Sequence, residues 1–226
     1  MAPSINPGAL LWRADRREQL ALKRGFDLLC AALGLVVLCP VLLCAAAAVR
    51  FSGPGPVFYR QTRIGRDGRP FAILKFRTMV ADADRLGLPI TVGRDPRITA
   101  VGAFLRRSKL DELPQLLNVL RGDMSLVGPR PEVPKYVARY TDAQRRVLWV
   151  RPGITDPASI QYRDENTLLA NFDDPEEAYV RQVLPAKLAM NLAYLQNFSF
   201  WGDLGLLFGT ALRLARDAAG NTRKQL

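Results

Sequence analysis

The hydrophobic pattern of the chain is dominated by one long apolar stretch, Leu28 to Val49, which contains no charged residue. A bilayer core about 30 Å thick is crossed by about 20 helical residues, so this stretch is long enough to span a membrane. Pro40 lies near its middle, where a proline removes a backbone N–H and bends a helix. Because each arm beside Pro40 is too short to cross alone, the pattern predicts a bent segment rather than a simple span.

The residues on both sides of this stretch are basic. They are Arg13, Arg16, Arg17, Lys23 and Arg24 before it, and Arg50, Arg60, Arg63 and Arg66 after it. The positive-inside rule assigns both flanks to the cytoplasmic side of the membrane. We therefore predict a re-entrant membrane helix over residues 23–50, which enters and leaves the bilayer on one face. A straight span and a cleaved signal peptide are the alternatives.

The stretch "PVFYRQTRIGRDGRPFAILKFRTM" predicts a β-hairpin. Asp67-Gly68 is a typical type I′ pair, because both central positions of that turn require a positive φ. Pro70 bounds the second strand. Lys75 and Arg77 are two residues apart in this strand, so they share one of its faces. Such a face is either solvated or directed at an anion.

Three helices are predicted beyond the hairpin. The segment "GRDPRITAVGAFLRRS" indicates a turn and then a short helix, and longer helices are expected from Pro175 to about Asn197 and from Asp203 to about Ala218. The last helix is either a core helix or an amphipathic helix on the bilayer surface. Its apolar positions at helical spacing are Leu204, Leu207, Phe208, Ala211 and Leu214 or Ala215.

These patterns divide the chain into three parts. Residues 1–22 form an N-terminal basic tail, residues 23–50 the re-entrant membrane helix, and residues 51–226 one compact catalytic domain on the cytoplasmic face. The expected fold class is mixed α/β, with a β-hairpin and amphipathic surface helices. No run after Phe51 reaches about 18 apolar residues, so we expect no second span.

Composition narrows the chemistry. The 226 residues carry a net charge of +11, which favours phosphates and anionic bilayers as partners. The absence of histidine excludes Ser-His-Asp and Cys-His catalysis and most zinc sites. The three cysteines, Cys30, Cys39 and Cys44, lie inside the apolar stretch at a spacing that fits no metal or redox motif. We expect them to act as small apolar side chains.

Two adjacent acids, Asp111 and Glu112, precede an apolar helical pattern. Its apolar positions are Leu113, Leu116, Leu117 and Leu120, and Gly122 is a suitable C-terminal stop. Because Pro114 is tolerated only in the first turn of a helix, the helix should begin near Asp111, with Asp111 at or close to the N-cap. Simple capping is therefore one explanation of the acid pair.

A second explanation comes from the cations that surround the pair. Arg130 in "GPRP" and Arg151 in "RPGIT" are stiffened by neighbouring prolines, and Lys75, Arg77 and Arg106 add further charge. Two carboxylates among fixed cations suit a phosphate ester with a divalent metal. The carboxylates hold the metal or attack phosphorus, and the cations neutralise phosphoryl oxygens. Hard oxygen ligands favour Mg²⁺.

Four stretches together resemble a known family, the bacterial initiating sugar transferases, which are monotopic polyprenol-phosphate phosphoglycosyl transferases. The stretches are "KRGFDLLCAALGLVVLCP", "GPVFYRQTRIGRDGRPFAILKFRTM", "LDELPQLLNVLRGDMSLVGPRPE" and "VRPGIT". The resemblance extends from about Lys23 to the C-terminus. It implies an enzyme of the bacterial inner membrane that transfers a sugar-1-phosphate from a UDP-sugar to a polyprenol phosphate, such as undecaprenyl phosphate, and releases UMP.

The resemblance also implies roles for individual residues. Asp111 matches the nucleophile of a ping-pong reaction, and Glu112 its partner at the metal or as a base. Lys75, Arg106 and Arg130 match basic active-site positions, and the re-entrant helix would break at Cys39-Pro40. The implied pathway is the first membrane step of exopolysaccharide or glycoconjugate synthesis.

The chain departs from the family pattern at two places. Lys109 stands where many members have Ser or Thr, and Asp156-Pro157 follows "PGIT" where many have Gly-Trp. These departures leave open which sugar is used; residues 154–171 are the candidate region for sugar recognition. Larger relatives carry four additional N-terminal spans, so this chain resembles the minimal catalytic form.

Three rival functions remain at this stage. A phosphatase or nucleotidyltransferase would use Asp111 and Glu112 only as metal ligands. A basic peripheral protein would bind lipid or nucleic acid, but the aromatic residues that stack on single strands are absent between Phe104 and Tyr136, so we expect no nucleic-acid partner. A scaffold subunit with an inactive site is the third. A homodimer is compatible with the sequence, although no stretch argues for one.

Overall fold

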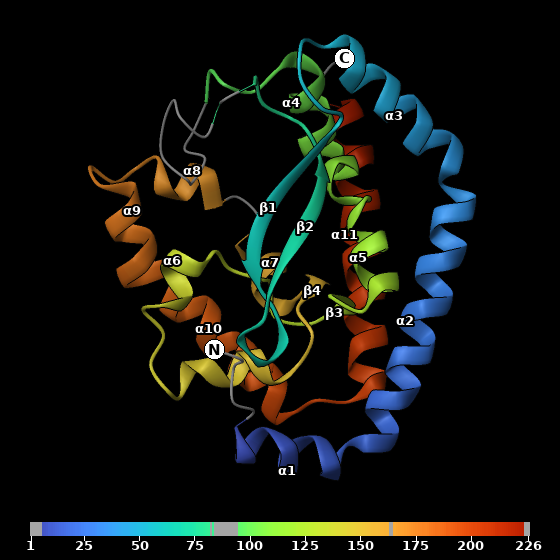
Figure 1. The fold of residues 1–226 in the computed structure, drawn as a ribbon. Coiled ribbons are helices and arrows are strands. Elements are labelled where there is room, and N and C mark those ends of the chain that lie inside the picture. The colour runs from blue at the N-terminus through green and yellow to red at the C-terminus, as the bar shows by residue number, and fades with distance from the viewer. Residues whose placement is uncertain (1–5, 82, 84–94, 163–164, 224–226) are drawn as a thin grey trace.

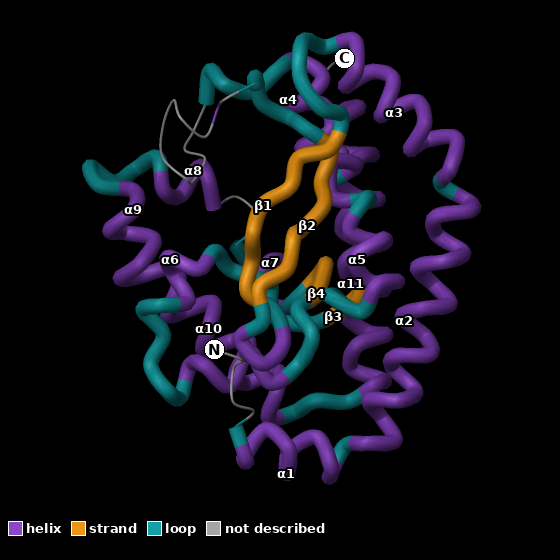
Figure 2. The backbone as a smooth tube through the Cα atoms, viewed as in Figure 1, coloured by secondary structure: helices purple, strands orange, loops and turns teal. Residues whose placement is uncertain are grey.

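The computed structural model describes residues 6–81, 83, 95–162 and 165–223, and these form a mixed α/β fold (Figure 1). The two long N-terminal helices run along one edge of the molecule, the β1–β2 hairpin lies at its centre, and α5 and α11 lie between the hairpin and α2 (Figures 1 and 2). The strands are β1 (Phe58–Ile64), β2 (Pro70–Phe76), β3 (Ser125–Val127) and β4 (Gly153–Thr155). The α-helices are α1 (Pro7–Asp15), α2 (Arg17–Val37), α3 (Cys39–Phe51), α4 (Ala100–Ser108), α5 (Gln115–Arg121), α6 (Pro134–Val137), α7 (Pro157–Gln161), α8 (Glu165–Leu169), α9 (Pro175–Ala178), α10 (Leu184–Gln196) and α11 (Phe200–Arg223).

The part of the predicted basic tail, residues 1–22, that the structure describes is mostly helical. Residues 7–15 form α1, which is capped by the Asn6 side chain, and α2 already begins at Arg17. The Arg13 guanidinium donates to the Trp149 carbonyl at 2.8 Å and forms an ion pair with Asp67. The segment before the long apolar stretch is therefore packed against residues that follow it.

The predicted break in the apolar stretch is present. Helix α2 ends at Val37 and α3 starts at Cys39, with Pro40 at its second position, so the break falls on Leu38, one residue before Cys39-Pro40. The two helices are bent by 64°. No single helix in the described residues is long and apolar enough to cross a membrane, whereas the bent pair passes that test by length and composition.

Helix α2 has one face directed at the domain and one at the surroundings. Lys23, Asp27 and Ala31, spaced by four residues, are buried. Asp27 accepts hydrogen bonds from the Ser125 hydroxyl at 2.7 Å and the Leu126 N–H at 3.2 Å, which attaches α2 to β3. The exposed apolar residues of the helix pair include Leu29, Leu33, Val36, Val37 and Leu43.

The hairpin forms as predicted. β1 and β2 pair antiparallel from Phe58 opposite Phe76 to Ile64 opposite Pro70. Asp67 and Gly68 have φ values of 60° and 73°, and the Arg69 N–H donates to the Arg66 carbonyl at 3.2 Å, as a type I′ turn requires.

Helix α5 is clamped to the hairpin by a buried asparagine. The Asn118 amide donates to the Ala72 carbonyl at 2.8 Å and accepts from the Leu74 N–H at 3.0 Å. Through these bonds the outer edge of β2 is paired with a side chain instead of a third strand.

Next to α5, the short parallel pair β3–β4 brings Gly128 against Gly153. A Cβ added to Gly153 would lie 2.1 Å from the Gly128 nitrogen, so this close approach requires glycine.

The later helices lie at the predicted positions. Residues 175–196 are helical as α9, a π-helical turn (Tyr179–Val183) and α10, and α11 covers the last predicted helix. Leu206 and Leu207 of α11 pack against the core, but Phe208 is 71% exposed. With Trp201 and Leu212 it forms an exposed apolar stripe, so α11 is a core helix on one face and apolar on its outer face.

Arg77, expected to bind phosphate, has a different set of contacts. Its guanidinium is buried and donates to the Val49 carbonyl at 2.9 Å, the Gly53 carbonyl at 2.8 Å and the Pro54 carbonyl. These carbonyls belong to the end of α3 and the loop that follows. Arg77 therefore holds the end of the apolar helix pair against β2. It also lines the cavity that contains Asp111, so its expected role as a phosphate ligand stays a prediction.

We expect Arg77→Gln to lower the free energy of unfolding by about 2–4 kcal/mol, because buried carbonyls lose a charged donor. Thermal unfolding in detergent measures this change. Arg50→Gln is the matched control, since Arg50 lies exposed in the last turn of α3 and should cost no more than about 0.5 kcal/mol. Equal melting temperatures for the two variants would contradict the assigned role of Arg77.

Candidate active site

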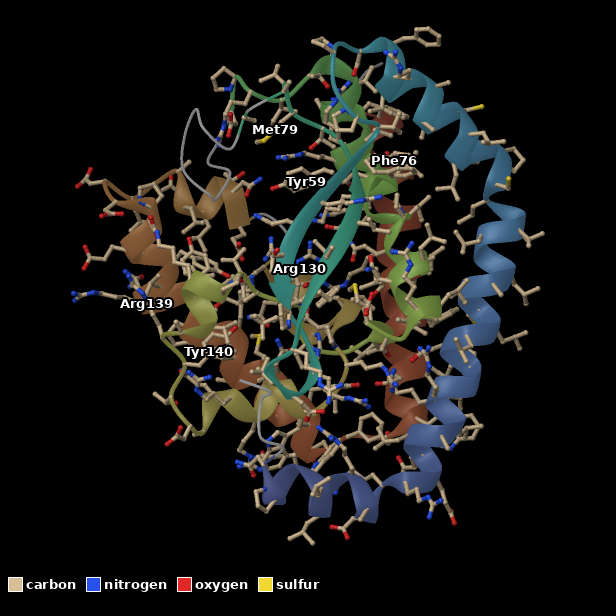
Figure 3. The ribbon with its side chains drawn as sticks, viewed as in Figure 1. Tyr59, Phe76, Met79, Arg130, Arg139 and Tyr140 are labelled. Carbon is tan, nitrogen blue, oxygen red and sulfur yellow. The ribbon has the colours of Figure 1, made fainter. Side chains whose placement is uncertain are left out.

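A cavity of about 1180 Å³ lies beside the hairpin and contains the acid pair. Its walls come from β1, the end of β2, α4, the turn that carries Asp111 and Glu112, the loop of Arg130, and α8. Figure 3 shows Arg130 in the centre of the molecule beside the two strands, with Tyr59 and Met79 further toward α4. Tyr59 and Met79 both line the same cavity.

The sequence predicted Asp111 at or close to the N-cap of a helix, but in the structure Asp111 does not cap one. Helix α4 ends at Ser108, and Lys109 adopts a left-handed conformation with φ 58°. A 3₁₀ turn, η3 (Leu110–Glu112), follows, and α5 begins only at Gln115 with Pro114 as its N-cap residue. The prediction failed because the turn at Lys109 and the Pro114 junction separate the acids from α5. The predicted end of this helix, Gly122 with φ 91°, is confirmed.

Glu112 is fixed between two cations. Its Oε1 accepts from the Lys75 ammonium at 2.8 Å and from the Arg130 guanidinium, and its Oε2 lies 3.3 Å from Arg130 Nη1. Burial by itself would raise the pKa of Glu112, but the charges of Arg130 and Lys75 outweigh burial and hold this pKa well below its ordinary value. Glu112 is therefore an ionised, paired carboxylate at neutral pH.

Asp111 is in the opposite state. It is buried, and its Oδ1 has no hydrogen-bond partner among the residues that the structure describes. Burial raises the pKa of Asp111 above its usual value, and the negative charge of Glu112 raises it further. Asp111 lines the cavity, so its carboxylate lies where a metal ion or the phosphorus atom of a substrate could reach it.

Arg130 is positioned by a residue that sequence reasoning did not assign to the site. The fully buried Asp156 accepts from the Arg130 N–H at 3.1 Å, from the Asn191 amide at 2.8 Å and from the Ser159 N–H at 2.6 Å. The sequence showed Asp156 only as a departure after "PGIT". Its position next to the loop of Arg130 depends on the parallel pairing of β3 and β4.

Arg106 lines the cavity, and its Nε donates to the Thr78 hydroxyl at 2.8 Å. Arg151, the remaining predicted phosphate ligand, does not line this cavity; it lies in a second cavity and donates to the Gly122 carbonyl at 2.8 Å. The structure thus brings Asp111, Glu112, Lys75, Arg77, Arg106 and Arg130 to one cavity, and it separates Arg151 from them.

The far end of the cavity contains polar residues that the sequence did not single out. The Tyr179 hydroxyl donates to Glu132 at 2.5 Å, and the buried Lys187 donates to Glu165 at 2.7 Å. Glu165, Asn166 and Thr167 of α8 line this end. They fall within residues 154–171, the region expected to recognise the sugar, so that expectation stays a prediction with three residues now in the cavity wall.

The acid pair fits a magnesium ion only in part. The described residues contain no group of three His, Cys, Asp or Glu side chains placed to hold a metal. Mg²⁺ usually takes one or two carboxylates and completes its shell with water and substrate phosphates. The unpartnered Oδ1 of Asp111 suits this arrangement. Glu112, in contrast, would have to share its oxygens with Lys75 and Arg130.

Comparison with known proteins gives one family and several relatives. Residues 18–217 match the family model described as bacterial sugar transferase. The UDP-glucose:undecaprenyl-phosphate glucose-1-phosphate transferase of Escherichia coli K12 is 40% identical over 197 residues, which cover 85% of this chain and 40% of that protein. The exopolysaccharide production protein PSS of Rhizobium leguminosarum is 39% identical, with 85% of this chain and 94% of that protein covered.

A third relative is named for a different sugar. The UDP-N-acetylgalactosamine-undecaprenyl-phosphate N-acetylgalactosaminephosphotransferase of Aeromonas hydrophila is 35% identical, with 84% of this chain and 42% of that protein covered. The chain thus spans less than half the length of the Escherichia coli and Aeromonas relatives.

Because the pKa values of Asp111 and Glu112 are shifted in opposite directions, we expect their substitution to change the stability of the fold in opposite directions. The folded-state pKa of Glu112 is depressed, so its contribution is present above the ordinary value of 4.5 and is lost as pH falls through the folded-state pKa. The folded-state pKa of Asp111 is raised, so its ionised form costs stability at pH 7, and that cost is absent below the ordinary value of 3.8. At pH 7 we expect Glu112→Gln to lower the melting temperature and Asp111→Asn to raise it.

Melting curves from pH 7 to pH 3 in detergent test this pair of variants, each acting as the control for the other. At pH 7 the wild type should be more stable than Glu112→Gln by about 2–4 kcal/mol, because two partly buried cations lose their partner in the variant. This difference should shrink toward pH 3. The gain from Asp111→Asn should vanish over the same range. Changes of the same sign at pH 7 would contradict the assigned charge states.

Proposed function

This chain belongs to the bacterial sugar transferase family, and we propose that it transfers a sugar-1-phosphate from a UDP-sugar to a polyprenol phosphate, with release of UMP. The observation that carries the proposal is the unequal acid pair. Glu112 is paired with Lys75 and Arg130, whereas the adjacent Asp111 lines the cavity, and its buried Oδ1 has no hydrogen-bond partner among the described residues. The relatives' names supply the two substrate classes.

The proposed first step is attack by the Asp111 carboxylate on the phosphorus that carries the sugar. The bond from this phosphorus to the bridging oxygen breaks, UMP leaves with the electron pair, and a phosphosugar–aspartyl intermediate remains. An ionised carboxylate needs no base, which agrees with a chain that lacks histidine. Burial keeps Asp111 weakly solvated, which favours attack.

In the second step an oxygen of the polyprenol phosphate attacks the same phosphorus, and the Asp111 carboxylate is the leaving group. The product is a polyprenyl diphospho-sugar, and no net proton transfer is required. Lys75, Arg106 and Arg130 line the cavity and would neutralise the phosphoryl oxygens in both steps. Glu112 orients Lys75 and Arg130 rather than reacting itself. Mg²⁺, when bound beside Asp111, would supply further charge neutralisation on the diphosphate.

The same proposal includes a re-entrant membrane helix formed by α2 and α3, on the cytoplasmic face of a bacterial inner membrane. Arg13 lies before the helix pair and contacts Asp67 and Trp149, which lie after it. This contact supports a loop that returns to the side from which it entered, because flanks on opposite sides of a bilayer could not touch. An anchor of this kind brings the cavity to the depth of a lipid phosphate.

UMP release tests the reaction. The protein in detergent receives Mg²⁺, undecaprenyl phosphate and one UDP-sugar at a time. We expect UMP from one donor or a few, its loss with EDTA, and a decrease of at least about a thousandfold for Asp111→Asn. Asp142→Asn, at an exposed position outside the cavity, is the matched control and should keep wild-type activity.

Intact-protein mass spectrometry separates the transferase from a metal-dependent phosphatase or nucleotidyltransferase. After an acid quench in the absence of the lipid, the wild type should gain the mass of one phosphosugar, and Asp111→Asn should not. UMP release without this adduct and without dependence on the lipid would favour the rival enzymes.

Cysteine labelling tests the membrane proposal. In a variant with Cys30, Cys39 and Cys44 replaced by Ser, we introduce Arg17→Cys before the helix pair or Arg69→Cys after it. Both positions are exposed. An impermeant maleimide should label both only after intact cells are opened, because both flanks face the cytoplasm. Labelling of one position from outside would favour a straight span.

A further inference from the structure

A second basic cluster lies outside the active site. Arg13 of α1, Arg24 of α2, Arg66 at the hairpin tip and Arg151 before β4 line a small cavity of about 60 Å³ together with Trp149. None of the residues that line this cavity lines the larger one. The cluster thus includes Arg151, the proline-flanked arginine that the catalytic site did not use.

The arginines are held in place by backbone carbonyls. Arg13 Nε donates to Trp149 at 2.8 Å, and Arg24 Nη1 donates to the Val119 carbonyl at 2.9 Å. Arg151 uses only its Nε, on the Gly122 carbonyl, so both of its terminal nitrogens lack a partner among the described residues. Arg66 has one contact there, with Asp67 Oδ2 at 3.5 Å. Several guanidinium N–H groups are therefore preorganised but not satisfied.

The charges in this cluster are unbalanced. Asp27 lines the cavity with the four arginines and is already bonded to β3, and Asp67 pairs with Arg13 and Arg66. Lys23 is paired with Asp203. Burial and the positive charges of Arg66 and Arg24 lower the pKa of Arg151 to about 10. A bound anion would remove this repulsion.

Capping of α5 explains only part of the cluster. Arg24 and the Nε of Arg151 neutralise carbonyls at the C-terminal end of α5, which is an ordinary structural role. Arg66 makes no contact with α5, since it lies on the hairpin tip. Neither its guanidinium nor the terminal nitrogens of Arg151 are used by the capping arrangement.

We propose that this cavity binds a phosphate group at a site separate from the catalytic one. Guanidinium groups bind phosphate oxygens in bidentate pairs, and Arg66 and Arg151 have the free N–H groups to do so. A cavity of about 60 Å³ accommodates a few water-sized groups, which suits one phosphate and excludes a nucleotide.

Two sources supply this chemistry: inorganic phosphate in solution and the headgroup of an anionic lipid. Lys23 and Arg24 lie one turn before Leu28, where the apolar stretch begins, so the cavity opens near the start of the proposed membrane segment. Basic residues at this level attract anionic headgroups. The same site would therefore serve either ligand, and the experiment distinguishes the two.

The test is a comparison of melting temperatures for the full chain and two matched variants. Arg66→Gln removes the cluster arginine with the fewest structural contacts. Arg69→Gln is the control, since Arg69 is exposed in the same hairpin turn and does not line the cavity. In detergent, inorganic phosphate replaces chloride at constant ionic strength. In nanodiscs, phosphatidylglycerol replaces part of the phosphatidylcholine.

We expect a stabilisation in the wild type and in Arg69→Gln that requires about tenfold more ligand in Arg66→Gln. Phosphate bound in the catalytic cavity stabilises all three proteins equally, so only the difference between the variants counts. A difference that depends on inorganic phosphate identifies a free-phosphate site, and one seen only with phosphatidylglycerol identifies a headgroup site.

An equal response of the wild type and both variants in both experiments would overturn the proposal. Arg151→Lys gives an independent check, because it keeps the charge but loses the planar fork, so it should weaken binding as Arg66→Gln does. UMP release by Arg66→Gln should match the wild type, so failure of the proposed reaction and failure of this site are separate results.

Discussion

The ion pairs of Glu112 are the interaction on which the rest of the site depends. One carboxylate joins Lys75 of β2, Arg130 of the loop after β3, and the short turn that also carries Asp111. Three segments far apart in the sequence are thereby held at one point beside the hairpin. Glu112 balances only one of the two positive charges of Lys75 and Arg130, so the pair of cations keeps a net positive charge beside Asp111, whose Oδ1 has no hydrogen-bond partner among the described residues.

The β2 strand, which carries Lys75, also connects the ion pairs of Glu112 to the helix pair α2–α3. Lys75 and Arg77 lie two residues apart; Lys75 reaches Glu112, and Arg77 reaches the carbonyls at the end of α3. On the other side, Asp27 attaches α2 to β3, close to the loop that carries Arg130. The apolar helices are thus bonded to the segments on both sides of the acid pair, so hydrogen bonds rather than a flexible linker set the distance from the helix pair to the Asp111 carboxylate.

The chain has a net charge of +11, and basic residues line both of its cavities, the large one with the acid pair and the small one with Arg151. In the large cavity, Lys75 and Arg130 are paired with Glu112, and the carboxylate of Asp111 lines the cavity beside them. In the small cavity, arginines outnumber the acids and are held by carbonyls, with their outer N–H groups unsatisfied. The first arrangement suits a reaction at phosphorus, and the second suits retention of an anion.

The sequence by itself determined the local features. Apolar length and Pro40 defined the bent helix pair, Asp67-Gly68 the hairpin turn, and the motif around Asp111 and Glu112 the acid pair, because each depends on a few neighbouring residues. Which cations join the acids was decided by the tertiary structure. Arg77, Arg151 and Arg130 look alike along the chain, yet only Arg130 reaches Glu112, because Asp156 and the β3–β4 pairing direct it there. A guanidinium binds whichever acceptor the fold brings within reach, and that choice depends on contacts between residues distant in sequence.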